Sequence, residues 1–224
     1  MPEPHETREQ RKPGRPTGEE SGAGRAALLA AARELLCEQG LSQLTSKAVA
    51  ARAGVKPTLV NYYFGGRRGL LQEVLAESSG ENTERMLAVA DREGPPEARL
   101  ADLIDGMLRG FAEEPYVPRL FFEQVMFAED EELDRFVERS GRASFDALRK
   151  VLRDGCRDGR FRSVDPEIAL AAIGGLCVFF GAATPLLQRL TGMGPMTPET
   201  VGGIAERAAA LILHGLMTPG ETET

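Results

Sequence analysis

The sequence predicts an all-α protein, because apolar residues recur at helical spacing along most of its 224 residues. No stretch alternates apolar and polar residues as a half-buried β-strand would. Clusters of glycine and proline divide the pattern into pieces of helix length. The chain length suits one compact domain or a small module joined to a larger one. We expect an N-terminal module of three short helices followed by a larger helical domain.

The composition excludes several classes of protein. Hydrophobic residues make up 42% and charged residues 27%, which is typical of a soluble globular chain. The three cysteines, Cys37, Cys156 and Cys177, are far apart and form no CxxC pair, so a disulfide framework or zinc ribbon is not expected. The only histidines are His5 and His214, too few for most metal sites and histidine-based catalysis. We therefore predict no metal, no cofactor, no enzymatic activity and a reducing compartment.

Charge is distributed unevenly along the chain. The net charge is -7, but residues 1–79 carry 11 basic and 9 acidic residues, which leaves 16 and 25 for residues 80–224. Three of the four lysines, Lys12, Lys47 and Lys56, lie in the first part. A phosphate-facing surface is therefore expected there rather than in the acidic remainder.

Helix signals follow one another closely after residue 22. From Arg25, apolar residues at helical spacing predict a helix that stops at Gly40. Thr45 opens a short second helix that ends near Gly54. Pro57 begins a third helix, which contains Tyr62-Tyr63-Phe64 and ends at Gly65-Gly66. A fourth helix follows from about residue 69 to residue 90.

The rest of the chain is also predicted to be helical. Further helices are expected near 97–113, 118–128, 131–158, 165–188 and 198–216. The expected organisation is an arm over 1–22, a first helical domain over 23–79, and a larger helical domain over 80–224.

One stretch, residues 168–187, contains no charged residue and is long enough to span a membrane. It is the only such run, and it contains Gly174, Gly175, Gly181 and Pro185. Small residues let another helix approach closely, so we expect a helix buried between partners. A transmembrane helix is the alternative.

Residues 25–71 carry the most informative pattern. An apolar helix ends in Gly40; Thr45 is followed by Val49-Ala50, then by Ala53-Gly54-Val55, Tyr62-Tyr63-Phe64, Arg67 and Leu70-Leu71. In residue type and spacing this stretch resembles the DNA-binding module of the tetracycline-repressor (TetR) family. Beyond residue 80 the resemblance extends only to the helical architecture. The resemblance implies a DNA-binding domain over 23–79 and a ligand-binding and dimerisation domain over 80–224. The alternative is a plain three-helix subdomain with solvated charges.

The chemistry of this stretch also suits DNA. Two short helices joined at Gly54 form a helix-turn-helix, whose second helix fits a major groove about 12 Å wide. Lys56 and Thr58 lie at the N-terminus of that helix, where the helix dipole favours phosphate oxygens. Asn61 can pair with base edges, and Tyr62 can donate to phosphate.

The resemblance implies that Thr45 contacts phosphate and that Lys47 reaches the groove edge or a base. Arg67 is expected to clamp the DNA backbone, and Tyr63 to pack or to touch DNA. Asn61, Tyr63, Gly66 and Arg67 depart from the family's commonest residues, which affects fine recognition geometry. The predicted DNA-binding residues are Thr45, Lys47, Lys56, Pro57, Thr58, Asn61, Tyr62, Tyr63 and Arg67.

The first 22 residues are polar and lack apolar periodicity, so we expect a mobile arm with no signal peptide. Arg11, Lys12 and Arg15 lie in the run RKPGRP, which resembles an AT-hook that inserts arginine into a narrow minor groove. Glutamates offset the basic residues of the arm, so a solvated linker is the alternative.

Aromatic residues and methionines concentrate in the second part of the chain. We expect an apolar cavity there that holds a small molecule, with ordinary core packing as the alternative. The predicted lining residues are Met107, Phe111, Phe122, Met126, Phe145 and Phe180.

The resemblance implies a cytoplasmic, nucleoid-associated transcriptional regulator that acts as a repressor, which is the usual role in the family. It would bind a palindromic double-stranded operator as a homodimer and leave it when an unknown small-molecule effector binds. Half-sites about one helical turn, ~34 Å, apart would match the dimer. The last two long helices would form a four-helix bundle with the same helices of the second subunit. This bundle would account for the charge-free stretch without a membrane. Alternatives are a small-molecule-binding protein or enzyme with a vestigial helix-turn-helix, and an architectural DNA-binding protein with a fully packed second part.

Overall fold

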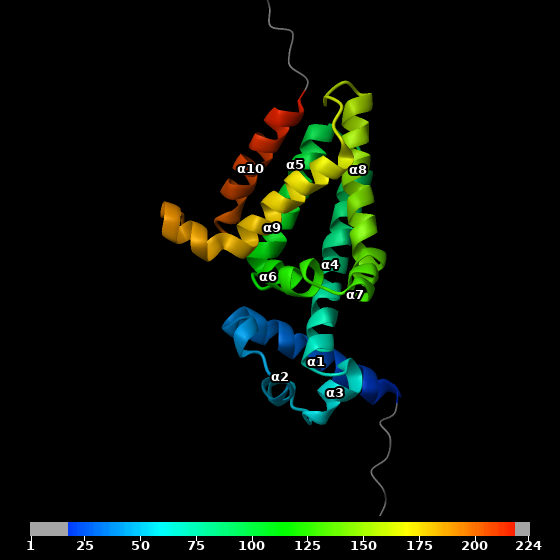
Figure 1. The fold of residues 1–224 in the computed structure, drawn as a ribbon, viewed down its shortest axis with the longest axis vertical. Helices are drawn as coiled ribbons and strands as arrows, with labels where there is room; N and C mark the ends of the chain where they lie inside the picture. Colours follow the sequence, from blue (N-terminus) through cyan, green and yellow to red (C-terminus); the bar gives the residue numbers. More distant parts are fainter. Residues whose placement is uncertain (1–17, 218–224) are drawn as a thin grey trace, which may run out of the picture.

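The computed structural model describes residues 18–217, without the side chains of 18–21, and this part of the chain is all-α (Figure 1). The only extended pairing within it is an isolated bridge between Phe161 and Met217. The α-helices are α1 (Gly18–Gln39), α2 (Ser46–Arg52), α3 (Thr58–Phe64), α4 (Arg67–Asp91), α5 (Pro96–Glu113), α6 (Val117–Phe121), α7 (Asp130–Phe136), α8 (Arg142–Arg157), α9 (Pro166–Thr191) and α10 (Val201–Leu216). A 3-10 turn, η1 (Leu41–Gln43), precedes α2, and two π-helical turns, η2 (Phe122–Met126) and η3 (Val137–Gly141), flank α7.

The predicted helices are confirmed, with one correction at the N-terminus. Helix α1 begins at Gly18, so residues 18–22 belong to it and not to the arm. Gly18 and Gly22 disfavour a helix, and no apolar periodicity predicts its start before Arg25. The proposed minor-groove residues Arg11, Lys12 and Arg15 lie outside the described residues.

The N-terminal module packs α1, α2 and α3 against the first half of α4 (Figure 1). Leu28, Val49, Val60 and Leu70 are completely buried in its core. The same core also contains Leu120 of α6, so it continues into the second part of the chain. Helix α4 runs without a break through the expected boundary between residues 79 and 80. The boundary is therefore the middle of a shared helix.

The larger domain is built around α5, which contacts α4, α8, α9 and α10. Leu100, Ile104 and Leu108 of α5 are completely buried, at the helical spacing that the sequence predicts. One buried ion pair joins α5 to α8: Arg99 Nη1 lies 3.1 Å from Asp154 Oδ2. Arg99 also donates to the carbonyl of Ala90 at the end of α4. This pair ties three helices together at the end of the domain far from the N-terminal module.

Helix α9 contains the charge-free run, and by length and composition it could cross a membrane. It contacts α5, α6 and α8, yet only Ala169, Ile173 and Cys177 are buried along it. Large apolar side chains remain exposed on it and on α10: Ile168, Leu170, Phe179, Leu186, Leu190 and Leu211. The expected close approach occurs at Gly181, where an added Cβ would lie 2.4 Å from Pro118 Cγ of α6.

Candidate DNA-binding surface and ligand cavity

The start of α2 has the predicted geometry. Thr45 is the N-cap, and its Oγ1 accepts a hydrogen bond of 3.1 Å from the backbone N–H of Ala48. This bond satisfies one of the free donors of the first turn and leaves the hydroxyl proton available for a phosphate oxygen. Lys47 is exposed beside it. The two side chains thus lie together on the exposed start of α2.

The turn between α2 and α3 depends on Gly54, whose φ of 69° lies in the left-handed region that favours glycine. Helix α3 then follows Pro57 and buries Val60. The predicted contact residues lie on its exposed side, where Tyr62 is 61% exposed. The exposed residues of this surface are Lys56, Pro57, Thr58, Asn61 and Tyr62. The structure therefore brings five of the predicted contact residues to α3 and the two residues before it.

Tyr63 lies among packing residues rather than on this surface. Its ring is half-buried and meets the rings of Tyr62 and Phe64 edge to face, with centroids 4.9 Å and 6.2 Å away. Its hydroxyl faces Gly24 of α1, where an added Cβ would lie 3.5 Å from the oxygen. Of the two expected roles, the geometry matches packing of α3 against α1.

Arg67 makes two hydrogen bonds within the protein, and its expected contact with the DNA backbone stays a prediction. Its Nε donates to the carbonyl of Leu44 and its Nη2 to the carbonyl of Leu41, both at 2.7 Å. These bonds join the first residue of α4 to the η1 turn and the residue before the α2 cap. The guanidinium thus links the start of α4 to the segment before α2. Spacing along the sequence does not indicate this contact.

Replacing Arg67 with methionine is expected to lower the free energy of unfolding by about 1.5–3 kcal/mol, the worth of a hydrogen bond to a charged group. Operator affinity should fall as well, because the two hydrogen bonds of Arg67 hold the segment that leads into α2. Urea unfolding without DNA measures the first effect, and Arg67→Lys should recover part of it. If unfolding is unchanged while DNA binding weakens, the phosphate-clamp role is correct instead.

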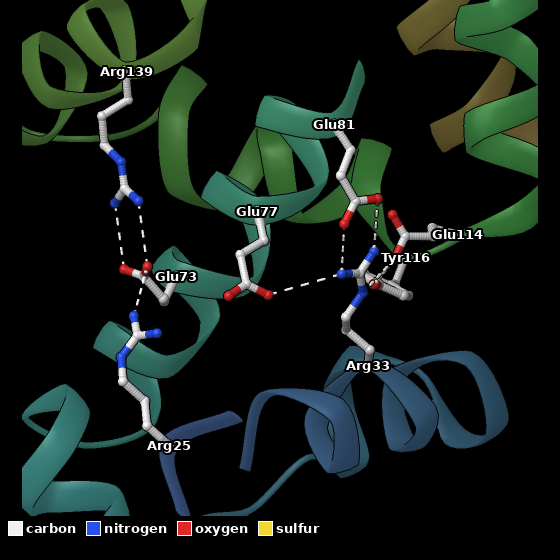
Figure 2. Close-up of polar contacts among 8 residues, drawn as sticks. All are labelled: Arg25, Arg33, Glu73, Glu77, Glu81, Glu114, Tyr116 and Arg139. Carbon is white, nitrogen blue, oxygen red and sulfur yellow. Dashed lines mark hydrogen bonds and ion pairs between the residues drawn. The ribbon is translucent and has the colours of Figure 1, made fainter. Parts of the chain in front are cut away.

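Two clusters of charged residues connect α1 to the rest of the chain (Figure 2). In the first, Glu73 of α4 accepts from Arg25 of α1 at 2.7 Å and from Arg139 of η3 at 3.3 Å. Burial alone would raise the pKa of Glu73, but the hydrogen bonds from both arginines lower it below its ordinary value. Glu73 therefore stays ionised and joins the N-terminal module to η3.

In the second cluster, Arg33 of α1 contacts Glu81 of α4 at 2.9 Å and Glu114 at 2.9 Å (Figure 2). Glu77 lies farther away, 3.8 Å from Arg33. The hydroxyl of Tyr116 donates to Glu114. The hydrogen bond from Arg33 lowers the pKa of Glu81, whereas burial and the neighbouring Glu114 raise that of Tyr116. A second contact thus links α1 to the segment between α5 and α6.

A cavity of about 720 Å³ lies between α4, α5, α8 and α9 and is bordered by η2 and η3. Its wall is almost entirely apolar. Five of the six predicted residues line it: Met107, Phe111, Phe122, Met126 and Phe145. Phe180, the sixth, is not among the residues that line it. Helix α9 faces the cavity with Ala171, Gly174, Gly175 and Val178, a helical stripe on which Phe180 does not lie.

The sequence analysis missed several polar lining residues, among them Ser78 of α4 and Ser140 of η3. A lone serine in a helix has no distinguishing pattern, so no sequence signal pointed to them. Within residues 18–217, no group of three His, Cys, Asp or Glu side chains could hold a metal ion. The apolar wall of the cavity suits an organic molecule.

Comparison with known proteins identifies the family. Residues 28–74 match the family of bacterial regulatory proteins of the tetR type, and residues 93–181 match a tetracyclin repressor-like C-terminal domain. The HTH-type transcriptional regulators BetI of Vibrio campbellii and Vibrio parahaemolyticus are 27% and 28% identical over 134 residues. Each match covers 56% of this chain and 65% of the relative, less than two thirds of its length.

Solved structures share the fold. A TetR/AcrR regulator from Thermobifida fusca has a TM-score of 0.66 at 21% identity, over 85% of this chain and 97% of its own. A tetR-family protein from Rhodococcus RHA1 has a TM-score of 0.69 at 18% identity, over 88% and 98%. FadR of Bacillus subtilis, solved with stearoyl-CoA, has a TM-score of 0.66 at 18% identity, over 85% and 98%. With the helix-turn-helix and the helical second part both matched, the chain belongs to the TetR family of bacterial transcriptional regulators.

Proposed function

We propose that this regulator is a cytoplasmic homodimeric repressor that binds a palindromic operator through α3 and is released by a small molecule in the cavity. The observation that carries the proposal is the exposed polar surface of α3 in a chain whose second part encloses a large apolar cavity. A polar, narrow helix suits the major groove, and an apolar concave site suits a small molecule. The absence of catalytic constellations in the sequence favours this over an enzyme with a vestigial helix-turn-helix.

The exposed apolar residues of α9 and α10 support a dimer. Phe179, Leu186 and Leu190 on α9 and Leu211 on α10 are each at least half exposed within one chain. Exposed large apolar side chains on two long helices commonly mark an interface. Two helices from each subunit would form a four-helix bundle, and the second subunit would cover these side chains.

Replacing Leu190 and Leu211 with glutamate is expected to convert the dimer into a folded monomer. Both side chains are exposed in the single chain, so the subunit itself loses little packing. Operator affinity should fall by about 100-fold, because binding at one half-site no longer raises the effective concentration of a second DNA-binding module at the other. Sedimentation velocity measures the association state, and Leu133→Glu on α7 is the matched control. A dimer that persists in the double variant would contradict this interface.

The contacts of the cavity wall suggest how a ligand reaches the DNA-binding module. Glu114 lines the cavity and holds Arg33 of α1. Ser140 lines it too, next to Arg139, which shares Glu73 with Arg25 of α1. A ligand that shifts η3 or the start of α6 would therefore change contacts with α1 and the spacing of the two α3 helices. Allosteric coupling of about 1–3 kcal/mol changes operator occupancy 5- to 150-fold.

Selection of genomic fragments by the purified chain at stated salt tests the proposal. A palindromic consensus bound at nanomolar concentration is the expected result. Weak, sequence-independent binding with a steep salt dependence would favour an architectural protein. Absence of DNA binding together with ligand turnover would favour the enzyme alternative.

A further inference from the structure

We infer that the cavity takes a neutral, largely apolar molecule whose hydroxyl or carbonyl group is held by the Ser140 hydroxyl. The inference rests on the proposed function, because it names the ligand class of the same cavity. Two observations carry it: a buried hydroxyl on the cavity wall that the protein leaves unpaired, and the pairing of Glu114, the acidic residue that lines the cavity.

Ser140 lies in the π-helical turn η3 and is 3% exposed. Its Oγ makes no hydrogen bond to any described protein group. Buried hydroxyls are nearly always hydrogen-bonded, because an unpaired one has lost its hydration without compensation. Ser140 also lines the cavity, so a ligand there can supply the partner that the protein does not. A hydroxyl both donates and accepts, and it therefore suits an alcohol or a carbonyl.

A neighbouring pair of hydroxyls provides a built-in comparison. Ser144, one turn farther along the same helical segment, also lines the cavity. Its Oγ lies 2.7 Å from Thr83 Oγ1 of α4, so this hydroxyl already has a protein partner. On α4, the buried Ser78 lies five residues before Thr83, lines the cavity and, like Ser140, has an Oγ without a hydrogen-bond partner among the described residues. The wall between α4 and η3 is thus the polar part of an apolar cavity.

The charges around the cavity disfavour an ionic ligand group at this wall. Glu114 is engaged by Arg33 at 2.9 Å and by the Tyr116 hydroxyl. The two lining arginines, Arg85 and Arg142, are exposed and keep access to water. An ammonium group beside Ser140 would lose its hydration without gaining a free carboxylate, and a carboxylate there would need Arg85 or Arg142 to give up its access to water. A neutral head group avoids this cost.

The size and shape of the cavity leave room for the apolar body of such a molecule. Its volume of about 720 Å³ lies within the range of sites for drug-sized ligands. At Gly174 and Gly175 of α9, an added Cβ would meet no other atom within 4 Å. A leucine at position 174 can therefore reduce the volume of the cavity without a clash at its Cβ atom.

The test uses the full chain with 1-decanol, decanoate and decylammonium as probes that share one tail and differ in charge. Calorimetric titration should show that 1-decanol binds most tightly. Ser140→Ala should weaken 1-decanol about 10-fold, as expected for one lost hydrogen bond, and leave 1-chlorodecane unchanged. Gly174→Leu should weaken every probe.

Thermal unfolding without a probe separates this role from a structural one. Ser140→Ala should leave the Tm unchanged or raise it, because no protein hydrogen bond is lost. Ser144→Ala should lower the Tm, because it leaves Thr83 without its side-chain partner. A lower Tm for Ser140→Ala would show that Ser140 supports the fold and would overturn the inference.

Three binding results would also overturn it: tighter binding of decanoate that depends on Arg142, no binding of 1-decanol, or equal affinity of the wild type and Ser140→Ala for 1-decanol. Operator binding by the same preparations keeps the two proposals apart. If the operator is bound and these probes fail, only the ligand class is wrong. If no operator is bound at all, the regulator proposal fails whatever the probes do.

Discussion

Replacing both Lys47 and Lys56 with glutamate is expected to lower operator affinity by about 1000-fold. The two lysines lie at the starts of α2 and α3, and both are exposed. A dimer would lose four cationic contacts, each worth about 1 kcal/mol or more, and 1.4 kcal/mol corresponds to a factor of ten. The slope of log affinity against log salt should also become shallower, because fewer counterions are released.

Titration of a labelled operator at several salt concentrations measures both quantities. Arg153→Glu with Arg162→Glu is the matched control, because these exposed arginines lie outside the helix-turn-helix and the change in net charge is identical. The control should lose far less affinity. Equal losses for the two double variants would mean that overall charge, and not the predicted surface, controls binding.

Replacing Asp154 with alanine is expected to lower the free energy of unfolding by about 3–5 kcal/mol. The side chain of Arg99 is only 7% exposed, and its Nη1 lies 3.1 Å from Asp154 Oδ2. Its Nε already lacks a hydrogen-bond partner. Without the carboxylate, a buried guanidinium would keep only the carbonyl of Ala90, so a charge would remain in the core without compensation.

Urea unfolding followed by circular dichroism measures this loss. Asp158→Ala is the matched control, because this neighbouring aspartate is exposed and should change stability by less than about 0.5 kcal/mol. Replacing both partners, with Arg99→Met and Asp154→Leu, should recover much of the loss, since the buried charge disappears. A small effect of Asp154→Ala alone would show that water reaches Arg99.

The sequence by itself determined the class of fold, the order of the helices and the exposed surface of α3. These features depend on residues close together in the chain. Gly65 ends α3 because it adopts φ of 69°, and Thr45 caps α2 through an amide three residues later. Helical periodicity likewise buries Val60 and leaves Tyr62 outside.

Other features were decided only by the tertiary structure. Arg67 donates to carbonyls 23 and 26 residues away. Phe180 lies off the stripe of α9 that faces the cavity, and Ser140 meets that cavity without a protein partner. Each outcome depends on the rotation and register of helices that are far apart in the chain. Local spacing shows which residues share a helix face, but only packing between helices determines what that face meets.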